Sequence, residues 1–249
     1  MLDPHSSPFP IPMRNESKFQ ETLENAQTPQ TEKDGKILEQ EMGFSYRRAI
    51  GELIYAMVSC RPDISFPVIK LSQYSANPAK EHYIAVKEVY KYLRDTKEDG
   101  LYFWRSTPNP YLSEADEPVP KPDVYSPQHA PTDCSSELEG LVDATWANDS
   151  SHRRSVTGIA LMFAGGCVYY KTKFQPTIAL SSTESEFAAA CDAGKAILYV
   201  RSILDEINMP QHEATVLYID NRGALLMANA QQPTRRTRHV SMKHFALLD

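Results

Sequence analysis

The sequence predicts an α/β protein in which helices pack on a sheet, with a small helical segment ahead of it. The first observation behind this class is that apolar residues recur at helical spacing within residues 46–105. The second is that short β-type runs alternate with helical patterns from Gly140 onward. The 249 residues suffice for one or two domains with buried cores. No internal repeat is visible, so the two packed parts are different structures.

Two acidic, proline-containing stretches flank the first packed part. Five of the 18 prolines fall in residues 1–45 and seven in residues 106–140. The first stretch carries four basic and eight acidic groups, and the second carries one and seven. Low apolar content combined with proline does not offset the entropy lost on ordering. We therefore predict that residues 1–45 are a largely disordered linker and that residues 106–139 are a second linker.

The net charge of −6 argues against a uniformly basic nucleic-acid binder. The average is misleading because the acid is concentrated in the two linkers. Residues 46–105 hold ten basic and seven acidic groups, and residues 141–249 hold eleven and ten. The packed parts are therefore slightly basic, and nucleic acid stays a candidate partner.

Cysteine spacing and hydropathy exclude several classes of protein. Cys60, Cys134, Cys167 and Cys191 lie 74, 33 and 24 residues apart, with no C-x-x-C pair. This spacing fits neither a zinc module nor a redox motif. No apolar run approaches the ~18 residues of a membrane span, and the N-terminus lacks a basic start followed by a hydrophobic stretch. We expect an intracellular protein of the cytoplasm, the nucleus or both, with no membrane partner.

Three helices are expected in the first packed part. From Tyr46 onward apolar residues at helical spacing define one face of a helix that ends near Cys60. Asp63 is a candidate cap for a second helix, which stops before Asn77-Pro78. The third helix spans Glu81 to Thr96, with its lysine and arginine side chains outward.

The second packed part is expected to begin with an antiparallel meander of three strands. The β-type runs cover residues 141–146, 158–163 and 167–172. A long helix should follow from Ser182 or Thr183 to Asn208, because Ser-Ser-Thr-Glu-Ser-Glu supplies a cap and early carboxylates. Next we expect a buried strand over residues 215–219, a short helix over residues 222–229, an Arg-rich loop and a terminal helical piece.

Three carboxylates come from three of these expected elements. Asp143 interrupts an otherwise apolar strand, and a charge there needs a partner or a metal. Glu186 lies in the first turns of the long helix, and Asp220 ends a strand where open sheets place their ligands. Their convergence would be unfavourable without a cation, and hard oxygen ligands suit Mg²⁺ or Mn²⁺.

Each of these carboxylates also has a purely structural interpretation. Asp143 and Asp220 are equally consistent with aspartates that turn the chain at strand ends. Glu186 is consistent with a carboxylate that the helix dipole favours near the N-terminus. Spacing alone does not separate this interpretation from a metal site.

Several motifs together resemble those of one family. Residues 140–249 resemble the ribonuclease H domain at the end of the copia-type retrotransposon polyprotein. The matching motifs are V-D-A-T-W-A-N-D (142–149), R-R-S-V-T-G (153–158), K-F-Q-P-T-I-A-L-S-S-T-E-S-E-F (173–187), Y-I-D-N (218–221) and R-T-R-H-V (236–240). Residues 46–105 are similar to the segment that connects reverse transcriptase to that domain. The motifs there are Y-R-R-A-I-G-E-L-I-Y-A (46–56), R-P-D-I-S-F (61–66) and L-S-Q-Y-S-A-N-P (71–78).

The resemblance implies a ribonuclease H-like mixed sheet with flanking helices, and an active site of four carboxylates that hold two divalent cations. The family's ligands carry over to Asp143, to Asp220 and to Glu186 rather than Glu184. Glu184 lies two residues earlier and would point about 200° away round the helix. The fourth position is Ser241, which departs from the family because serine supplies no anionic ligand. Serine is able instead to cap the helix that starts there.

The implied reaction is metal-assisted endonucleolytic hydrolysis of the RNA strand of an RNA–DNA hybrid. Recognition would rest on 2′-hydroxyls and phosphates rather than on sequence. His239 either assists product release or satisfies a backbone carbonyl. Candidate nucleic-acid contacts are Arg153, Arg154, Lys171, Lys173, Asn221, Arg235, Arg236 and Arg238.

Two functional hypotheses stay open at the level of sequence. The first is an active hybrid ribonuclease, motivated by Asp143, Glu186 and Asp220. The second is a non-catalytic remnant that folds and binds nucleic acid, motivated by Ser241. No Asp-Asp pair occurs in the chain, so the Y-x-D-D metal site of a polymerase palm is absent. A reverse transcriptase domain of the same polyprotein is therefore expected as a separate partner.

Overall fold

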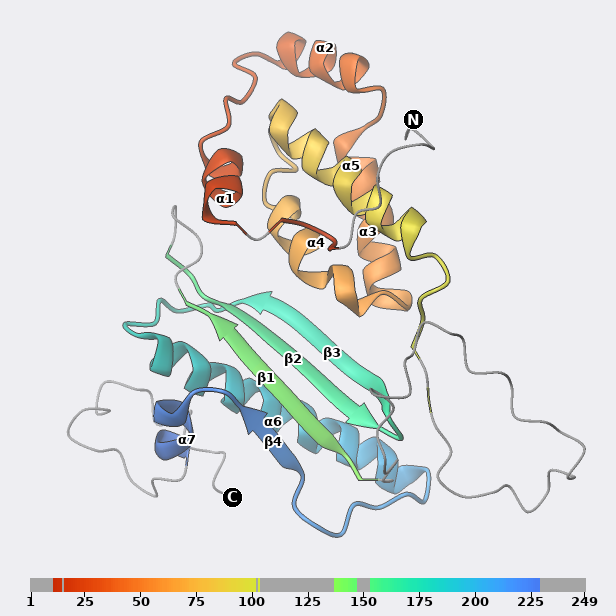
Figure 1. Ribbon diagram of the computed structural model, residues 1–249, viewed down its shortest axis with the longest axis vertical. Helices are drawn as coiled ribbons and strands as arrows, with labels where there is room; N and C mark the ends of the chain where they lie inside the picture. Colours follow the sequence, from red (N-terminus) through yellow and green to blue (C-terminus); the bar gives the residue numbers. More distant parts are fainter. Residues whose placement is uncertain (1–10, 15, 102, 104–136, 147–152, 229–249) are drawn as a thin grey trace, which may run out of the picture. The chain divides into compact units, whose positions relative to one another are not determined.

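The computed structural model describes residues 11–14, 16–101, 103, 137–146 and 153–228. They belong to two compact units, a helical unit built mainly of the chain up to Gly100 and a sheet unit built mainly of later residues. The α/β class is confirmed, with helices and a mixed four-stranded sheet (Figure 1). Most of the linker over residues 106–139, the Arg-rich loop and the terminal helical piece lie outside the described residues. None of the described helices is long and apolar enough to cross a membrane.

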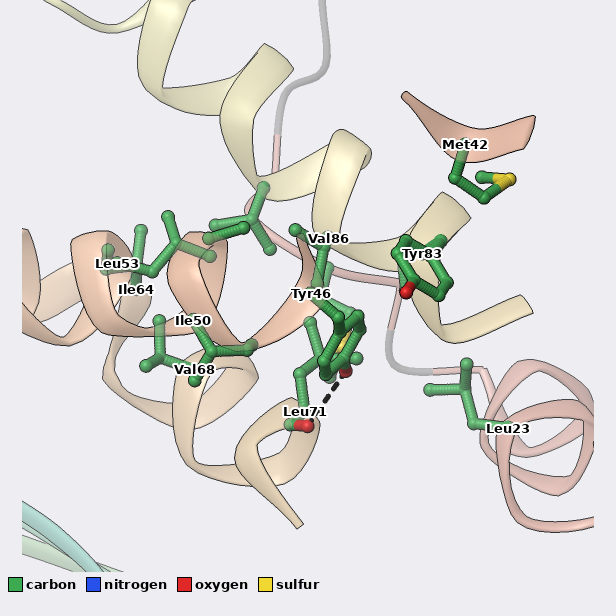
Figure 2. Packing of buried hydrophobic residues seen from close by; sticks show 14 residues of the cluster. Leu23, Met42, Tyr46, Ile50, Leu53, Ile64, Val68, Leu71, Tyr83 and Val86 are labelled. Carbon is green, nitrogen blue, oxygen red and sulfur yellow. Dashed lines mark hydrogen bonds between the residues drawn. The ribbon is translucent and has the colours of Figure 1, made fainter. Parts of the chain in front are cut away.

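The helical unit contains the three helices expected from the sequence and two earlier ones. Its described elements are α1 (Ser17–Glu24), α2 (Glu32–Met42), α3 (Tyr46–Ser59), the 3-10 turn η1 (Pro62–Ile64), α4 (Ser65–Ser72) and α5 (Lys80–Asp95). The core forms from the apolar sides of α3, α4 and α5 (Figure 2). Tyr46, Ile50 and Leu53 follow one another by four and three residues, and each is at most 3% exposed. Burying each aliphatic side chain of this kind stabilises the unit by ~1.5–3 kcal/mol.

The tyrosine in this core has its polar atom satisfied. The Tyr46 hydroxyl donates to the backbone carbonyl of Leu71 at 2.9 Å, the dashed line in Figure 2. Its ring meets the ring of Tyr83 edge-on, with centroids 5.1 Å apart. Burial also raises the pKa of Tyr46, so the hydroxyl keeps its proton and acts as a donor.

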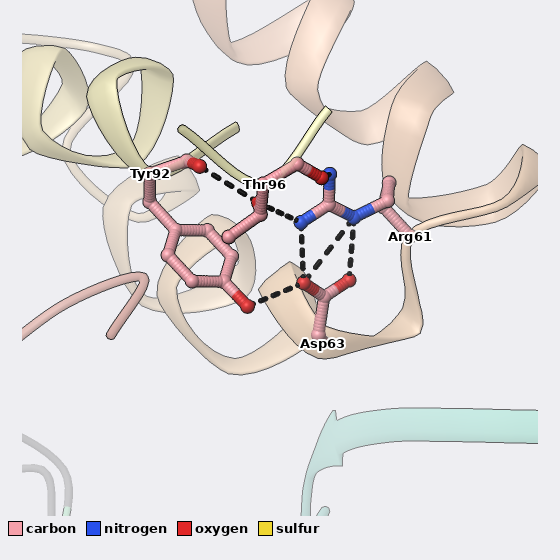
Figure 3. A network of polar contacts seen from close by, with 4 residues as sticks. All are labelled: Arg61, Asp63, Tyr92 and Thr96. Atoms are coloured by element: carbon pink, nitrogen blue, oxygen red, sulfur yellow. Dashed lines mark hydrogen bonds and ion pairs between the residues drawn. The ribbon is translucent and has the colours of Figure 1, made fainter. Parts of the chain in front are cut away.

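An arginine network fixes the end of α5 to η1. Arg61 is buried, and its guanidinium forms a two-pronged ion pair with Asp63, with a shortest contact of 2.7 Å (Figure 3). Arg61 also donates to the carbonyl and the hydroxyl of Thr96, and the Tyr92 hydroxyl donates to Asp63 at 2.8 Å. Burial raises the pKa of Asp63, but the hydrogen bonds from Arg61 and Tyr92 outweigh it, so the pKa lies below its ordinary value. The expected cap is corrected: Asp63 caps no helix and is the partner of Arg61.

The expectation of a largely disordered linker over residues 1–45 is corrected for residues 16–45. Both α1 and α2 lie in this range, and Leu23 is 1% exposed. Glu24 forms an ion pair with the buried Lys70 at 2.8 Å. The Leu23 carbonyl lies 2.8 Å from Nε2 of the buried His82. Average composition hid these few anchoring contacts, because a short segment needs only one or two of them to dock on a core that already exists.

The sheet unit is built around strands in the order β3-β2-β1-β4. The described elements are β1 (Glu139–Thr145), β2 (Val156–Phe163), β3 (Gly166–Phe174), α6 (Ser182–Glu206), β4 (Val216–Ile219) and α7 (Arg222–Ala228). In Figure 1 the arrow of β2 runs opposite to those of β1 and β3, which is the expected meander. β4 pairs with β1 in parallel, with Gly140 opposite Leu217. All six elements were expected in this order, with ends that differ by at most two residues. The expectation of a buried strand is wrong for β4, an edge strand in which Val216 and Tyr218 are more than half exposed.

Helix α6 covers one face of this sheet. Residues of β1 alternate, so Val142 and Ala144 are buried beneath the helix while Asp143 is exposed. Small residues of α6, among them Ala189, Ala190 and Ala193, let the helix pack closely on the strands. This packing brings the first turns of α6 to the carboxyl ends of β1 and β4 (Figure 1).

Candidate metal centre

Three carboxylates from three elements converge at this edge of the sheet. One oxygen each from Asp143 of β1, Glu186 of α6 and Asp220 after β4 lie within 4.8 Å of one another. Like charges at this separation repel one another unless protons or cations neutralise them. The carboxyl ends of β1 and β4 lie side by side because the two strands are parallel neighbours. The start of α6 lies at the same edge because the helix packs on the face of these strands. The arrangement has the donor set of a divalent-cation site.

Glu186 and Glu184 have different tasks although only one residue separates them. The Ser181 side chain accepts from the Glu184 backbone N–H at 3.2 Å, and the Glu184 carboxylate accepts from the Leu180 N–H at 2.8 Å. This reciprocal pair closes the N-terminus of α6, so Glu184 is a capping residue. Glu186 instead is 5% exposed and lies with Asp143 and Asp220.

The environment of Glu186 disfavours its charge. Burial raises the pKa of Glu186 to about 7, and the charges of Asp143 and Asp220 add to the rise. A backbone hydrogen bond from Ala144 acts in the opposite direction. The Oε2 atom is buried and has no hydrogen-bond partner among the described residues. A buried acceptor without a donor is destabilising, and a cation at this point would remove that cost.

The residues after Asp220 start helix α7 and attach it to α6. Oδ1 of Asn221 accepts from the Ala224 backbone N–H at 3.0 Å and so caps the helix. Ala224 is fully buried with Phe187 and Cys191 of α6. Asn221 was expected as a nucleic-acid contact, and its side-chain oxygen has this structural use.

An aromatic side chain joins the end of β1 to the segment just before α6. Trp146 directly follows β1, three residues beyond Asp143, and is 48% exposed. Its indole N–H donates to the carbonyl of Ala179 at 3.1 Å, close to the start of α6. Because this bond uses the only polar atom of the ring, the exposed part of Trp146 is an apolar surface.

The other expected site residues divide into two groups. Arg153 and Arg154 are exposed, with Arg153 at a positive φ of 52°, and Lys173 is half-buried. The remaining candidates lie outside the described residues: Arg235, Arg236, Arg238, His239 and Ser241. The role of none of these residues is tested by the fold, and they stay predictions.

Sequence reasoning missed Trp146, Thr183 and Gly223. An aromatic residue soon after a strand aspartate was a visible signal for Trp146. Nothing in the local sequence marks Gly223 or Thr183, because their contact forms only where α7 packs against α6.

Comparison with known proteins gives two kinds of relative. The chain is 34% identical over 199 residues to the retrovirus-related Pol polyprotein from transposon TNT 1-94 of Nicotiana tabacum, which covers 80% of the chain and 13% of that protein. The polyprotein from transposon RE2 of Arabidopsis thaliana is 28% identical over 203 residues, or 81% of the chain and 12% of that protein. The chain therefore spans about an eighth of these polyproteins.

A third relative is much shorter. Secreted RxLR effector protein 161 of Plasmopara viticola is 34% identical over 155 residues, which cover 62% of the chain and 90% of that protein. No protein-family model matches the chain. No solved structure matches it either.

Proposed function

We propose that this chain, whose homologues include retrovirus-related Pol polyproteins of plant transposons, is a retrotransposon-derived ribonuclease H. It hydrolyses the RNA strand of an RNA–DNA hybrid with Mg²⁺ or Mn²⁺. The observation that carries this proposal is the convergence of Asp143, Glu186 and Asp220 within 4.8 Å. The α/β sheet with its mixed strand order agrees with the ribonuclease H-like fold that the sequence motifs imply.

The three carboxylates are suited to hold divalent cations. Divalent cations bound there would activate the attacking water and stabilise the departing 3′ oxygen of the RNA strand. The Ala144 N–H orients one oxygen of Glu186 and leaves the buried Oε2 available to a cation. Burial raises the pKa of Glu186 to about 7, so a cation held by this carboxyl would displace its proton.

The substrate class is inferred from the motifs and from the site. A hybrid differs from double-stranded DNA by the 2′-hydroxyls of one strand, which lie in a wide, shallow minor groove. Arg153 and Arg154 are exposed and able to meet phosphates, and the Arg-rich sequence of residues 235–238 adds three guanidinium groups. Trp146 follows Asp143 by three residues along the chain, and its exposed apolar surface would suit the sugar of a bound nucleotide.

A specific observation favours a second candidate function. Ser241 stands where the family supplies its fourth carboxylate. A chain with three ligands would bind hybrid and cleave it slowly or not at all. Loss of supporting groups at a metal site typically lowers affinity or activity by ~10–100-fold, and loss of a direct ligand should exceed that.

A nuclease assay with matched variants tests the proposal. The substrate is an end-labelled RNA–DNA hybrid with Mg²⁺ or Mn²⁺, and the corresponding RNA and DNA duplexes serve as substrate controls. We expect cleavage of the hybrid alone, abolished by Glu186→Gln and kept by Glu184→Gln, which makes the same charge change two residues away. Rescue of a weak wild type by Ser241→Asp would identify the missing ligand. If no variant cleaves while hybrid still binds, the non-catalytic alternative holds.

A further inference from the structure

Helix α7 approaches α6 closely at Gly223. A Cβ atom added to Gly223 would lie 2.9 Å from Cγ2 and 3.0 Å from Oγ1 of Thr183. It would also lie 3.1 Å from Oδ1 of Asn221, the atom that caps α7. The 2.9 Å contact is closer than real Cβ atoms come to a neighbour and the other two are tight, so a side chain at position 223 would force Thr183, Asn221 or the start of α7 to shift.

The contact between Gly223 and Thr183 is three residues along the chain from Asp220 on one side and from Glu186 on the other. Thr183 precedes Glu186 by three residues on α6, and Gly223 comes three residues after Asp220. The buried contact of Ala224 with Phe187 and Cys191 presses the two helices together from the next turn. The closest point between α6 and α7 therefore lies about one helical turn from the ligands that they carry.

We propose that Gly223 and Thr183 are positioning residues, whose contact sets the separation of Asp220 from Glu186. Any side chain at position 223 moves the start of α7 away from α6 and carries Asp220 with it. Packed interiors transmit such a shift because they contain few voids that could absorb it. The inference deepens the proposed function, since the consequence for cations rests on Asp143, Glu186 and Asp220 being their ligands.

A double-mutant cycle tests the positioning claim. Gly223→Ala introduces the clash, and Thr183→Ala removes both side-chain atoms that it would meet. We expect Gly223→Ala to raise the dissociation constant for Mn²⁺, measured by calorimetry, at least ~10-fold. The double variant should recover most of this affinity, and Thr183→Ala alone should change it little.

Leu204→Ala is the control for general destabilisation. Leu204 is buried in the core of the same unit and lies 18 residues beyond Glu186 on α6, so its truncation lowers stability far from the carboxylates. A purely structural role predicts that Gly223→Ala and Leu204→Ala both lower Tm and leave the Mn²⁺ affinity of the folded protein unchanged. That result would overturn the inference.

The failure of the inference can be told apart from the failure of the proposed function. If the wild type binds no Mn²⁺, the proposed function fails. Crystal structures of the wild type and of Gly223→Ala then decide the positioning claim without any metal. The distance between the Asp220 and Glu186 carboxylates must grow in Gly223→Ala and return in the double variant. An unchanged distance refutes the claim.

Discussion

The helical unit and the sheet unit bury charge in opposite ways. In the helical unit, Lys70 and Glu24 lie 2.8 Å apart with side chains 2% and 11% exposed. In the sheet unit, the buried Glu186 has two further carboxylates as its neighbours. A buried charge beside its opposite belongs to the fold, whereas gathered like charge costs stability until a cation joins it. The buried Lys70 with its oppositely charged partner is therefore read as structural, and the buried Glu186 with two carboxylate neighbours as the candidate functional charge.

The largest effect should come from breaking the buried pair. Lys70→Met leaves Glu24 buried without its ammonium partner, which should lower the free energy of unfolding by ~3–5 kcal/mol. Urea denaturation of the full chain measures it. The double variant Lys70→Met/Glu24→Gln should recover part of the loss, because no uncompensated charge remains. A loss below ~1 kcal/mol would place this pair with ordinary surface ion pairs.

In the sheet unit, removing a buried charge should raise the stability of the metal-free protein. The pKa of Glu186 is raised in the folded state, so without metal its ionisation destabilises the fold as pH rises from about 4.5 towards 7 and above. Glu186→Gln removes this penalty and should stabilise the metal-free protein by ~2 kcal/mol at pH 8, with little change at pH 4. Thermal unfolding at the two pH values measures it. Mn²⁺ should raise the Tm of the wild type but not that of the variant, and a stabilised variant that still responds to Mn²⁺ would contradict the ligand role.

A smaller effect is expected at the arginine network, where stability should fall as the pH is lowered. The pKa of Asp63 is lowered in the folded state, so its stabilisation is present above the unfolded pKa of ~3.9 and is lost as pH falls through the folded value. Asp63→Asn should therefore destabilise the protein at pH 7 by about 1 kcal/mol, since the carboxylate is partly exposed. The difference from wild type should shrink on acidification to pH 3. A difference that stays constant with pH would assign the effect to shape and not to charge.

The smallest change in stability is expected for Gly51→Ala, which contrasts with Gly223→Ala. Gly51 lies on α3 with nothing within 4 Å of an added Cβ, unlike Gly223. Gly51→Ala should stabilise the protein by ~0.5–1 kcal/mol, because alanine loses less entropy in a helix. Denaturant midpoints of the two alanine variants measure the contrast, with opposite signs expected.

Much of the sheet unit could be predicted from local pattern. The change from helical to alternating apolar spacing located its strands and α6, because these elements bury faces of a regular period. The convergence of Asp143, Glu186 and Asp220 at one edge of the sheet was expected because the three carboxylates come from two strands and the start of the helix that packs on them. The choice of Glu186 over Glu184 followed from helix geometry, and the cap formed by Glu184 explains it physically.

The features that escaped prediction depend on contacts between distant parts of the chain. α1 docks through Leu23 and Glu24 on residues more than 40 positions away, and nothing in its own composition announces this. Asp63 has the residue type of a helix cap, but its carboxylate accepts several hydrogen bonds from the nearby Arg61 and does not cap the helix. The tight approach at Gly223 likewise exists only once α6 and α7 are packed.

The ion pair between Glu24 and Lys70 also bears on how such a sequence can be inherited. The motifs that resemble the family begin at Tyr46, downstream of α1 and α2. A copy cut there would keep every family motif and yet expose a lone ammonium inside its helical core. The packed helical unit therefore includes Leu23 and Glu24, upstream of where the recognisable motifs start.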